Sequence, residues 1–492
     1  MTHEPDSHLT FWNLGSQQLR VSFDGGRIVA DAGLLAVRAL EKPLGIIAGL
    51  AERLPDPRSP QFIHHSAEAL LTQAVYQILA GYPDHNDAQQ LRDDPLFQIL
   101  ADVSPDADQP LASGSTQARF PYAYTRRQAV LPLEERPVLT EVRAAQCQRI
   151  KIANPYLVEL FVRTRRQAPT EVILDVDATD DPTHGAQTLS GYHGYFEQHQ
   201  YFPLLVYEGG SGFPLAAWLR PGTVPGSCGA VEILRPLVPA LRAAWPGVRI
   251  VLRADNGLAV PAVYDFCEQE GLEYVLGYAS NAVLQRRTAQ LLADLEVYHY
   301  WYGHREPHVQ HFEEITDYQA ESWPQPRRVV AKIKVTPQGS QRRFVVTNRA
   351  GSPASIYREF YVQRGKVPEQ PIGEPRVTMK NGLQADRLSA CGFSANSFRL
   401  LVHTLAYAIV VLFREATAAL PEVATATVGT LRQRLWKVGA VLVSSPRRLW
   451  LHVSEGWPLR GLWVRVQEAV AVFVASLGRV QRGLSTCGPL PM

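Results

Sequence analysis

Short apolar runs separated by turn residues dominate the middle of the chain, and their spacing predicts a mixed α/β sheet. Three runs follow one another closely: EVILDVDAT (171–179), YFPLLVYEG (201–209) and FPLAAWLRPG (213–222). We expect them to form an antiparallel meander of strands. Two helix–strand units come next, over 231–255 and 261–279. This order, β-β-β-α-β-α-β, is that of the RNase H-like fold, a mixed sheet with helices on both faces.

The flanking regions have other patterns. Residues 1–125 have apolar positions at helical spacing, as in HSAEALLTQAVYQILAGY, so we expect a mainly helical N-terminal domain. Its role is either packing or DNA binding of the helix-turn-helix type. Residues 285–350 alternate apolar and polar positions, including 297–318, which predicts a β-rich insertion within an α/β core over 165–415. A basic C-terminal region, 416–492, contains an expected hairpin at KVGAVLVSSPRRLWLHV.

Composition narrows the class of protein only slightly. The chain is 46% hydrophobic and 20% charged with a net charge of +2, so charge alone indicates no partner. Five cysteines stand without a C-x-x-C pair, which favours a reducing, cytoplasmic environment, here the bacterial cytoplasm. The longest apolar run, near 405–413, is too short to span a bilayer, so we expect a buried helix and no membrane association.

Two aspartates end predicted strands that are neighbours in this fold. Asp177 lies at the end of EVILDVDA and Asp255 at the end of VRIVLRAD. Side by side, two carboxylates repel each other unless a divalent cation neutralises them, and Mg²⁺ prefers oxygen ligands. A third acid is expected after the insertion, with Glu369 or Glu374 as candidates. Asp175 shares a strand face with Asp177 and is either a further ligand or a supporting carboxylate.

The same stretch also contains D-x-D-x-T, the nucleophile motif of haloacid-dehalogenase-type phosphatases. There Asp175 would be the nucleophile and Asp177 the acid–base. That enzyme class follows the motif with a helix and needs a later acidic pair. Further strands follow here, and RADNGLAV lacks the second acid, so this alternative is disfavoured.

Several longer motifs, in order, resemble the DDE transposases of bacterial insertion sequences. They are ILDVDATDDPTHG, GYHGYFEQHQYFPLLVYEG, LRPGTVPGS, LRADNG, YVQRG, ADRLSACGF and AN-F-RLLVHTLAY, with GYPDHNDAQQLRDDPLF and LASGSTQARF upstream. The most similar group is the thirteen-eighty group, related to transposases with a Y-R-E-K signature. The resemblance runs from about residue 20 to about 450.

The resemblance implies roles for individual residues. Asp177, Asp255 and Glu369 would be catalytic and hold Mg²⁺ or Mn²⁺, with Glu374 as the alternative third acid. Tyr361, Arg364 and Arg376 match the signature positions that contact DNA. The chain has one residue more than the signature between Arg364 and Glu369, and Arg376 replaces its lysine.

The implied function is a metal-dependent transposase that cleaves DNA and catalyses strand transfer. Its partners would be double-stranded DNA, both the transposon ends with their inverted repeats and the target, with a homodimer on paired ends. The alternative within the family is a catalytically impaired, transposase-derived DNA-binding protein.

Basic residues gather in two regions that are candidates for further DNA contact. The insertion carries seven and no acid over 327–349: Arg327, Arg328, Lys332, Lys334, Arg342, Arg343 and Arg349. We expect Arg342 and Arg343 to contact phosphates; a solvated strand face is the alternative. Trp301 and Trp323 could stack on a base or belong to the core. From residue 423, nine basic residues face only Glu455 and Glu468, which favours a DNA-contacting arm. His304, His308 and His311 have a spacing that could suit zinc, but no cysteine or acidic partner supports it.

Overall fold

The structure, a computed structural model, describes residues 8–54, 56, 58–123, 152–364 and 375–484. At its centre lies an eight-stranded sheet in the order β12-β13-β14-β11-β10-β4-β8-β9. Its bounds are β4 (Glu171–Ala178), β8 (Leu204–Glu208), β9 (Pro214–Trp218), β10 (Arg249–Ala254), β11 (Glu273–Tyr278), β12 (Val309–Tyr318), β13 (Arg327–Thr336) and β14 (Gly339–Thr347). β4, β8 and β9 form the antiparallel meander, and β10 and β11 run parallel to β4. The order β9-β8-β4-β10-β11 is that of the RNase H-like fold, so this prediction is confirmed.

Two helices connect the parallel strands, as the sequence pattern predicted: α8 (Ala230–Ala244) and α9 (Pro261–Gln269). α8 buries Ile233, Leu237 and Leu241 at helical spacing. Each such helix returns the chain so that the next strand runs in the same direction. The C-terminal ends of β4 and β10 therefore meet at one edge of the sheet.

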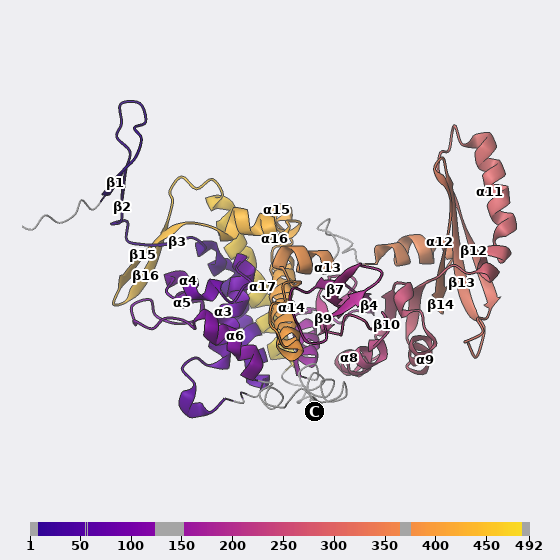
Figure 1. The fold of residues 1–492 in the computed structure, drawn as a ribbon, viewed down its shortest axis with the longest axis horizontal. Helices are drawn as coiled ribbons and strands as arrows, with labels where there is room; N and C mark the ends of the chain where they lie inside the picture. Colours follow the sequence, from indigo (N-terminus) through magenta and orange to yellow (C-terminus); the bar gives the residue numbers. More distant parts are fainter. Residues whose placement is uncertain (1–7, 55, 57, 124–151, 365–374, 485–492) are drawn as a thin grey trace, which may run out of the picture.

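The insertion lengthens this sheet. β14 pairs antiparallel with β11, and β13 and β12 follow outward, to the far end of the molecule in Figure 1. Two helices precede these strands: α10 (Ala282–Arg287) and α11 (Ala289–Tyr302). The prediction of strand over 297–302 was wrong, because these residues continue α11, which lies against β12 and β13. The alternation of aromatic residues there imitates a strand, but no helix-breaking residue intervenes before Gly303.

The N-terminal region is helical, as predicted. Its helices and turns are η1 (Ala32–Leu34), α1 (Leu35–Leu44), α2 (Ile46–Arg53), η2 (Pro60–Phe62), α3 (Ala67–Ala80), α4 (Asp87–Leu91), α5 (Pro95–Leu100) and α6 (Gly114–Ala123). They pack around α14 (Phe393–Ala416), which also contacts β9. In Figure 1, α14 stands between these helices and the sheet. One continuous core therefore joins the helical region to the sheet.

The C-terminal region folds back on the N-terminal helices. β15 (Ala440–Ser445) and β16 (Arg448–Val453) form the predicted hairpin, and β15 pairs with β3 (Arg27–Val29). α17 (Arg460–Leu484) lies against α1 and α14. The N-terminal region also contains β1 (His8–Thr10) and β2 (Arg20–Ser22), and the C-terminal region contains α15 (Pro421–Ala424), α16 (Val428–Leu431) and η8 (Arg432–Trp436).

Two helices of the described chain are long and apolar enough to cross a membrane by length and composition alone. The 18 most apolar consecutive residues of Phe393–Ala416 are all buried inside the fold, whereas 28% of the corresponding stretch of Arg460–Gly478 is buried. α17 turns one face, with Leu462, Val466 and Val470, toward the core. Such burial is typical of core helices of folded domains.

Short helical turns connect the insertion to α14. They are α12 (Pro353–Ser355), η5 (Ile356–Phe360) and η6 (Tyr361–Gln363), and after the undescribed residues 365–374, α13 (Pro375–Val377) and η7 (Thr378–Gly382). A small separate sheet, β5 (Asp181–Pro182), β7 (Gln198–Tyr201) and β6 (Gly191–His193), follows β4. Turns this short have little stability of their own, so their positions depend on side-chain contacts.

Candidate active site

The two predicted aspartates lie at the same edge of the sheet. β4 and β10 are parallel neighbours, and their register pairs Val176 with Ala254. Asp177 and Asp255 are the next residues along these two strands. The Asp255 carboxylate also accepts a hydrogen bond of 2.9 Å from the backbone N–H of Gly257, which fixes the turn after β10. The sequence prediction that both acids share one rim is confirmed.

Two arginines of the signature lie against these acids. Arg376 Nη1 is 3.3 Å from Asp177 Oδ2, and Arg364 Nη1 is 3.6 Å from Asp255 Oδ2. Burial disfavours the charge of Arg364, yet Tyr361 and the three acids Asp177, Asp255 and Asp175 outweigh this effect and raise its pKa. Both arginines line one cavity with Asp175, Val176, Asp177, Tyr207 and Pro375. Residues that lie far apart in sequence thus form one charged site.

Tyr361, at the start of η6, lies at the same edge of the sheet, against β11. Its hydroxyl lies so close to Gly277 on β11 that a Cβ there would be 2.5 Å from the hydroxyl oxygen. Burial raises the pKa of Tyr361, with Asp255 adding to the effect. Its ring centroid is 5.4 Å from that of Tyr357. Tyr361 is therefore neutral at physiological pH and can act as a hydrogen-bond donor.

Asp175 is a supporting carboxylate. It forms a bidentate ion pair with Arg253, with distances of 2.5 Å to Nε and 2.7 Å to Nη2. Both side chains are more than nine-tenths buried. A carboxylate held between two guanidinium hydrogen bonds in the interior is a poor nucleophile. This geometry, with a strand in place of the helix that should follow the motif, removes the phosphatase alternative.

The other residues singled out in the sequence have different positions. Glu369 and Glu374 lie outside the described residues. Trp323 is buried among Tyr264, Tyr278 and Tyr318, and belongs to the core. Trp301 is exposed on α11. No group of three or more histidine, cysteine or acidic side chains in the described part of the chain is arranged to hold a metal, so the histidines near 304–311 form no zinc site there.

The basic residues of the insertion divide into two sets. Four are held by intramolecular contacts: Arg327 by Asp265 and Glu268, Arg328 by Glu314, Arg349 by Glu171 and Glu273, and Arg342 by the Gln285 carbonyl at 2.7 Å. Lys332, Lys334 and Arg343 line an open cavity with Gln341, where the Lys332 ammonium also lies 5.1 Å from the centroid of the Tyr357 ring. The register pairs Lys332 with Arg343 and Lys334 with Gln341, so all four side chains point from one face of the sheet.

The chemistry of the two aspartates suits a divalent metal. Their donors are carboxylate oxygens, which hard cations such as Mg²⁺ prefer. Each acid already lies beside a cationic guanidinium, which shows that the edge attracts positive charge. Asp177 and Asp255 therefore fit as ligands, and a third would come from the undescribed segment 365–374.

The comparison with protein families decides the assignment. A family model described as transposase DDE domain, group 1, matches residues 11–473. The chain belongs to this family of transposases. No curated protein matches the sequence. A solved structure, the cryo-EM structure of the piggyBac transposase synaptic complex with hairpin DNA, is similar over 95% of this chain and 87% of that chain, with 12% identity and a TM-score of 0.39. A TM-score this low carries no weight for the fold, which rests on the strand order.

The sequence analysis missed three features in and beside the candidate site. They are Arg253 as the partner of Asp175, Gly277 beneath Tyr361, and Lys380, whose Nζ donates to the Asp180 carboxylate at 2.8 Å. One signal was present for Arg253. It stands two residues before Asp255 just as Asp175 stands two before Asp177, so opposite charges occupy matching positions on two neighbouring strands.

Proposed function

We propose that this transposase binds the ends of its element, cleaves DNA phosphodiesters and joins the ends to target DNA. The observation that supports this most directly is the pair Asp177 and Asp255 at adjacent ends of parallel strands, each beside an arginine. Asp177, Asp255 and Glu369, with Glu374 in reserve, would hold Mg²⁺ or Mn²⁺. A bound divalent ion supplies an activated oxygen nucleophile and stabilises the leaving oxygen.

The surrounding side chains would orient the DNA strand. Arg364 and Arg376 present guanidinium groups suited to bidentate phosphate contacts. In the structure these groups neutralise the acids, so DNA and cation binding would redistribute their contacts from carboxylate to phosphate. Tyr361 would donate a hydrogen bond from the same edge. The same edge of the sheet would thus bind phosphate through its arginines and a divalent cation through its aspartates.

A path for the DNA backbone leads from this edge along the insertion. Lys332, Lys334 and Arg343 share one face, and Arg343 lies near Tyr357 and Tyr361. Burial and the neighbouring positive charges lower the pKa of Lys332, which a phosphate would relieve. We assign Arg343 to DNA contact rather than Arg342, since Arg342 is bonded to a carbonyl of α10. A homodimer on paired ends remains part of the proposal.

The test compares cleavage with end binding. The purified protein is incubated with Mg²⁺ or Mn²⁺ and a duplex carrying the inverted repeats that flank its gene. We expect Asp177→Asn and Asp255→Asn each to reduce nicking at least about 10³-fold, since a metal ligand is lost. End binding should stay within about threefold, because neutralising an acid does not remove a phosphate contact.

Asp294→Asn, on the surface of α11, is the matched control and should cut normally. Wild-type protein that binds ends but never nicks them would favour the catalytically impaired alternative. Equal loss of binding and cutting in both site variants would show that the aspartates are structural. Glu369→Gln and Glu374→Gln, compared in the same assay, would identify the third acid.

A further inference from the structure

Charged residues form a ladder along one face of the three parallel strands. The register places Glu171 beside Arg249, and Asp175 beside Arg253, on β4 and β10. Because side chains alternate between faces, Asp177 and Asp255 continue the same row at the edge of the sheet. The ladder therefore runs from the beginning of these strands to the two aspartates, interrupted once by the apolar pair Ile173 and Val251.

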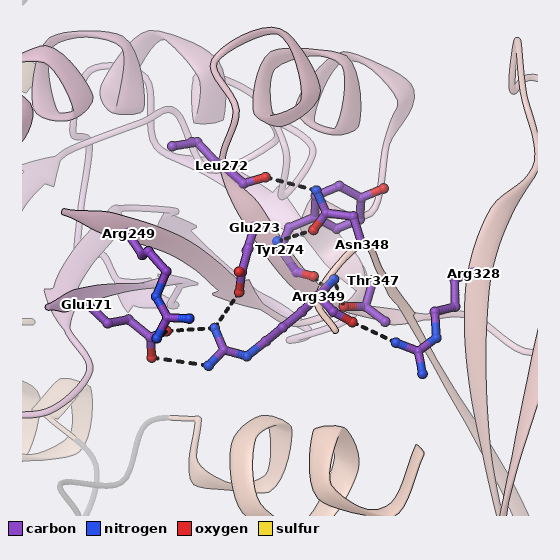
Figure 2. Close-up of polar contacts among 9 residues, drawn as sticks. All are labelled: Glu171, Arg249, Leu272, Glu273, Tyr274, Arg328, Thr347, Asn348 and Arg349. Atoms are coloured by element: carbon purple, nitrogen blue, oxygen red, sulfur yellow. Dashed lines mark hydrogen bonds and ion pairs between the residues drawn. The ribbon is translucent and has the colours of Figure 1, made fainter. Parts of the chain in front are cut away.

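At the end of the ladder away from the aspartates, Arg349 forms ion pairs with acids of two strands, β4 and β11. Its Nη1 is 2.8 Å from a Glu171 carboxylate oxygen and 2.5 Å from one of Glu273. Arg249 also contacts Glu171, at 3.2 Å. Figure 2 shows Arg349 pointing toward both acids, while its backbone carbonyl accepts a hydrogen bond from Arg328. The guanidinium of Arg349 is thus fixed in place from several directions.

Two arginines, the buried Arg253 and the partly exposed Arg349, contact Phe360, the residue directly before Tyr361. The guanidinium carbon of Arg349 lies 4.4 Å from the centroid of the Phe360 ring, and that of Arg253 lies 5.1 Å from it. Arg253 Nη1 also donates a 2.8 Å hydrogen bond to the Phe360 carbonyl. Because Arg253 is buried, its contact with the ring is worth more than the same contact at an exposed site.

We infer that Arg253 and Arg349 are positioning residues that act through Phe360 to set Tyr361 and Arg364 against Asp255. α12, η5 and η6 form one continuous helical stretch over 353–363, which is too short to be stable through its own backbone hydrogen bonds. Ile356 and Tyr357 bury its middle in an apolar cluster, and the two arginines fix its end, Phe360, to the same strands that carry the acids. The segment 353–364 and the acids then share one rigid support, which keeps Tyr361 over Gly277. The role in cleavage rests on the proposed function, whereas the role in ordering the segment does not.

The experiment uses the full-length protein and two readouts. Hydrogen exchange followed by mass spectrometry reports the order of 353–364 without any DNA or metal. We expect Phe360→Ala and Arg349→Gln to speed exchange there about fivefold or more, with β4 and β10 peptides unchanged. Cleavage turnover should fall up to about 10²-fold, as for a misplaced site, with end binding within about twofold.

Arg349→Lys should recover part of both effects, since it keeps a cation near the acids and the ring. Arg287→Gln, which removes an exposed partner of Asp317, is the control and should change neither readout. Exchange at 353–364 equal to that of the control would overturn the inference. Faster exchange with undiminished turnover would overturn it too. So would a loss of end binding that matches the loss of turnover, because Arg349 or Phe360 would then contact DNA. If Asp177→Asn still cuts DNA, the proposed function fails while the exchange result stands.

Discussion

Breaking the buried ion pair between Asp175 and Arg253 should cost more stability than any surface pair in the protein. The Arg253 side chain is 2% exposed and that of Asp175 is 9% exposed, and the two hydrogen bonds measure 2.5 and 2.7 Å. Removing one partner leaves an uncompensated charge in the interior, which costs about 3–5 kcal/mol. We therefore expect Asp175→Asn and Arg253→Met each to lower the free energy of unfolding by about that amount.

The double variant separates the pair from its surroundings. Asp175→Asn with Arg253→Met removes both charges, so its cost should be at least about 2 kcal/mol less than the sum of the single costs. Urea unfolding at neutral pH, followed by circular dichroism and intrinsic fluorescence, measures all four proteins of the cycle. Asp317→Asn, which breaks an exposed pair with Arg287, should cost under about 1 kcal/mol. Single costs below about 1 kcal/mol that simply add would refute the reasoning, since the pair would then be solvated.

Two further variants test the packing around the site. Gly277→Ala should reduce cleavage at least about tenfold without weakening end binding, because the new Cβ would displace the Tyr361 hydroxyl. Gly429→Ala is the control, since the atom nearest to its new Cβ would be 3.8 Å away. Equal cleavage by the two variants would contradict the close approach of Tyr361 to Gly277. Asp181→Asn should stabilise the protein increasingly as pH rises above the ordinary carboxyl pKa of 3.8. Burial, and then Asp386, raise the pKa of the Asp181 carboxyl well above its ordinary 3.8. Between the ordinary pKa and the raised one, the unfolded chain loses the Asp181 proton while the folded chain keeps it. The stability of the wild-type protein therefore falls as pH rises through this range, and the variant is spared this loss. A variant less stable than wild type at pH 7 in thermal unfolding would show that Asp181 is ionised and stabilising.

The order of strands and helices was readable from the sequence because it depends on local periodicity. The alternation in β4 and the helical spacing in α8 repeat within a few residues, so no distant contact is needed to recognise them. The failure at 297–302 has the same origin. Aromatic residues in that stretch alternate like a strand, but no helix-breaking residue interrupts them before Gly303, and α11 lies against β12 and β13 without burying a residue of its own.

The candidate site was half predictable. Asp177 and Asp255 could be placed together because parallel strands joined by helices bring their C-terminal ends to one edge. The sequence could not show which basic residues of the insertion bond within the fold and which line the cavity. Arg342 and Arg343 are adjacent in sequence, yet one is bonded to the carbonyl of Gln285 and the other faces an open cavity. One step along a strand reverses the face, and the face is known only from the neighbours.

The sequence by itself determined the RNase H-like order of elements, the two aspartates at strand ends and the family to which the chain belongs. Only the tertiary structure decided which charged side chains form ion pairs within the fold and which line an open cavity. It joined β3 to β15 across some 400 residues of chain, and it brought Arg253 and Arg349 to the ring of Phe360. These contacts link segments far apart in sequence. They form because a charge removed from water is costly in free energy unless a counter-charge or an aromatic face lies next to it.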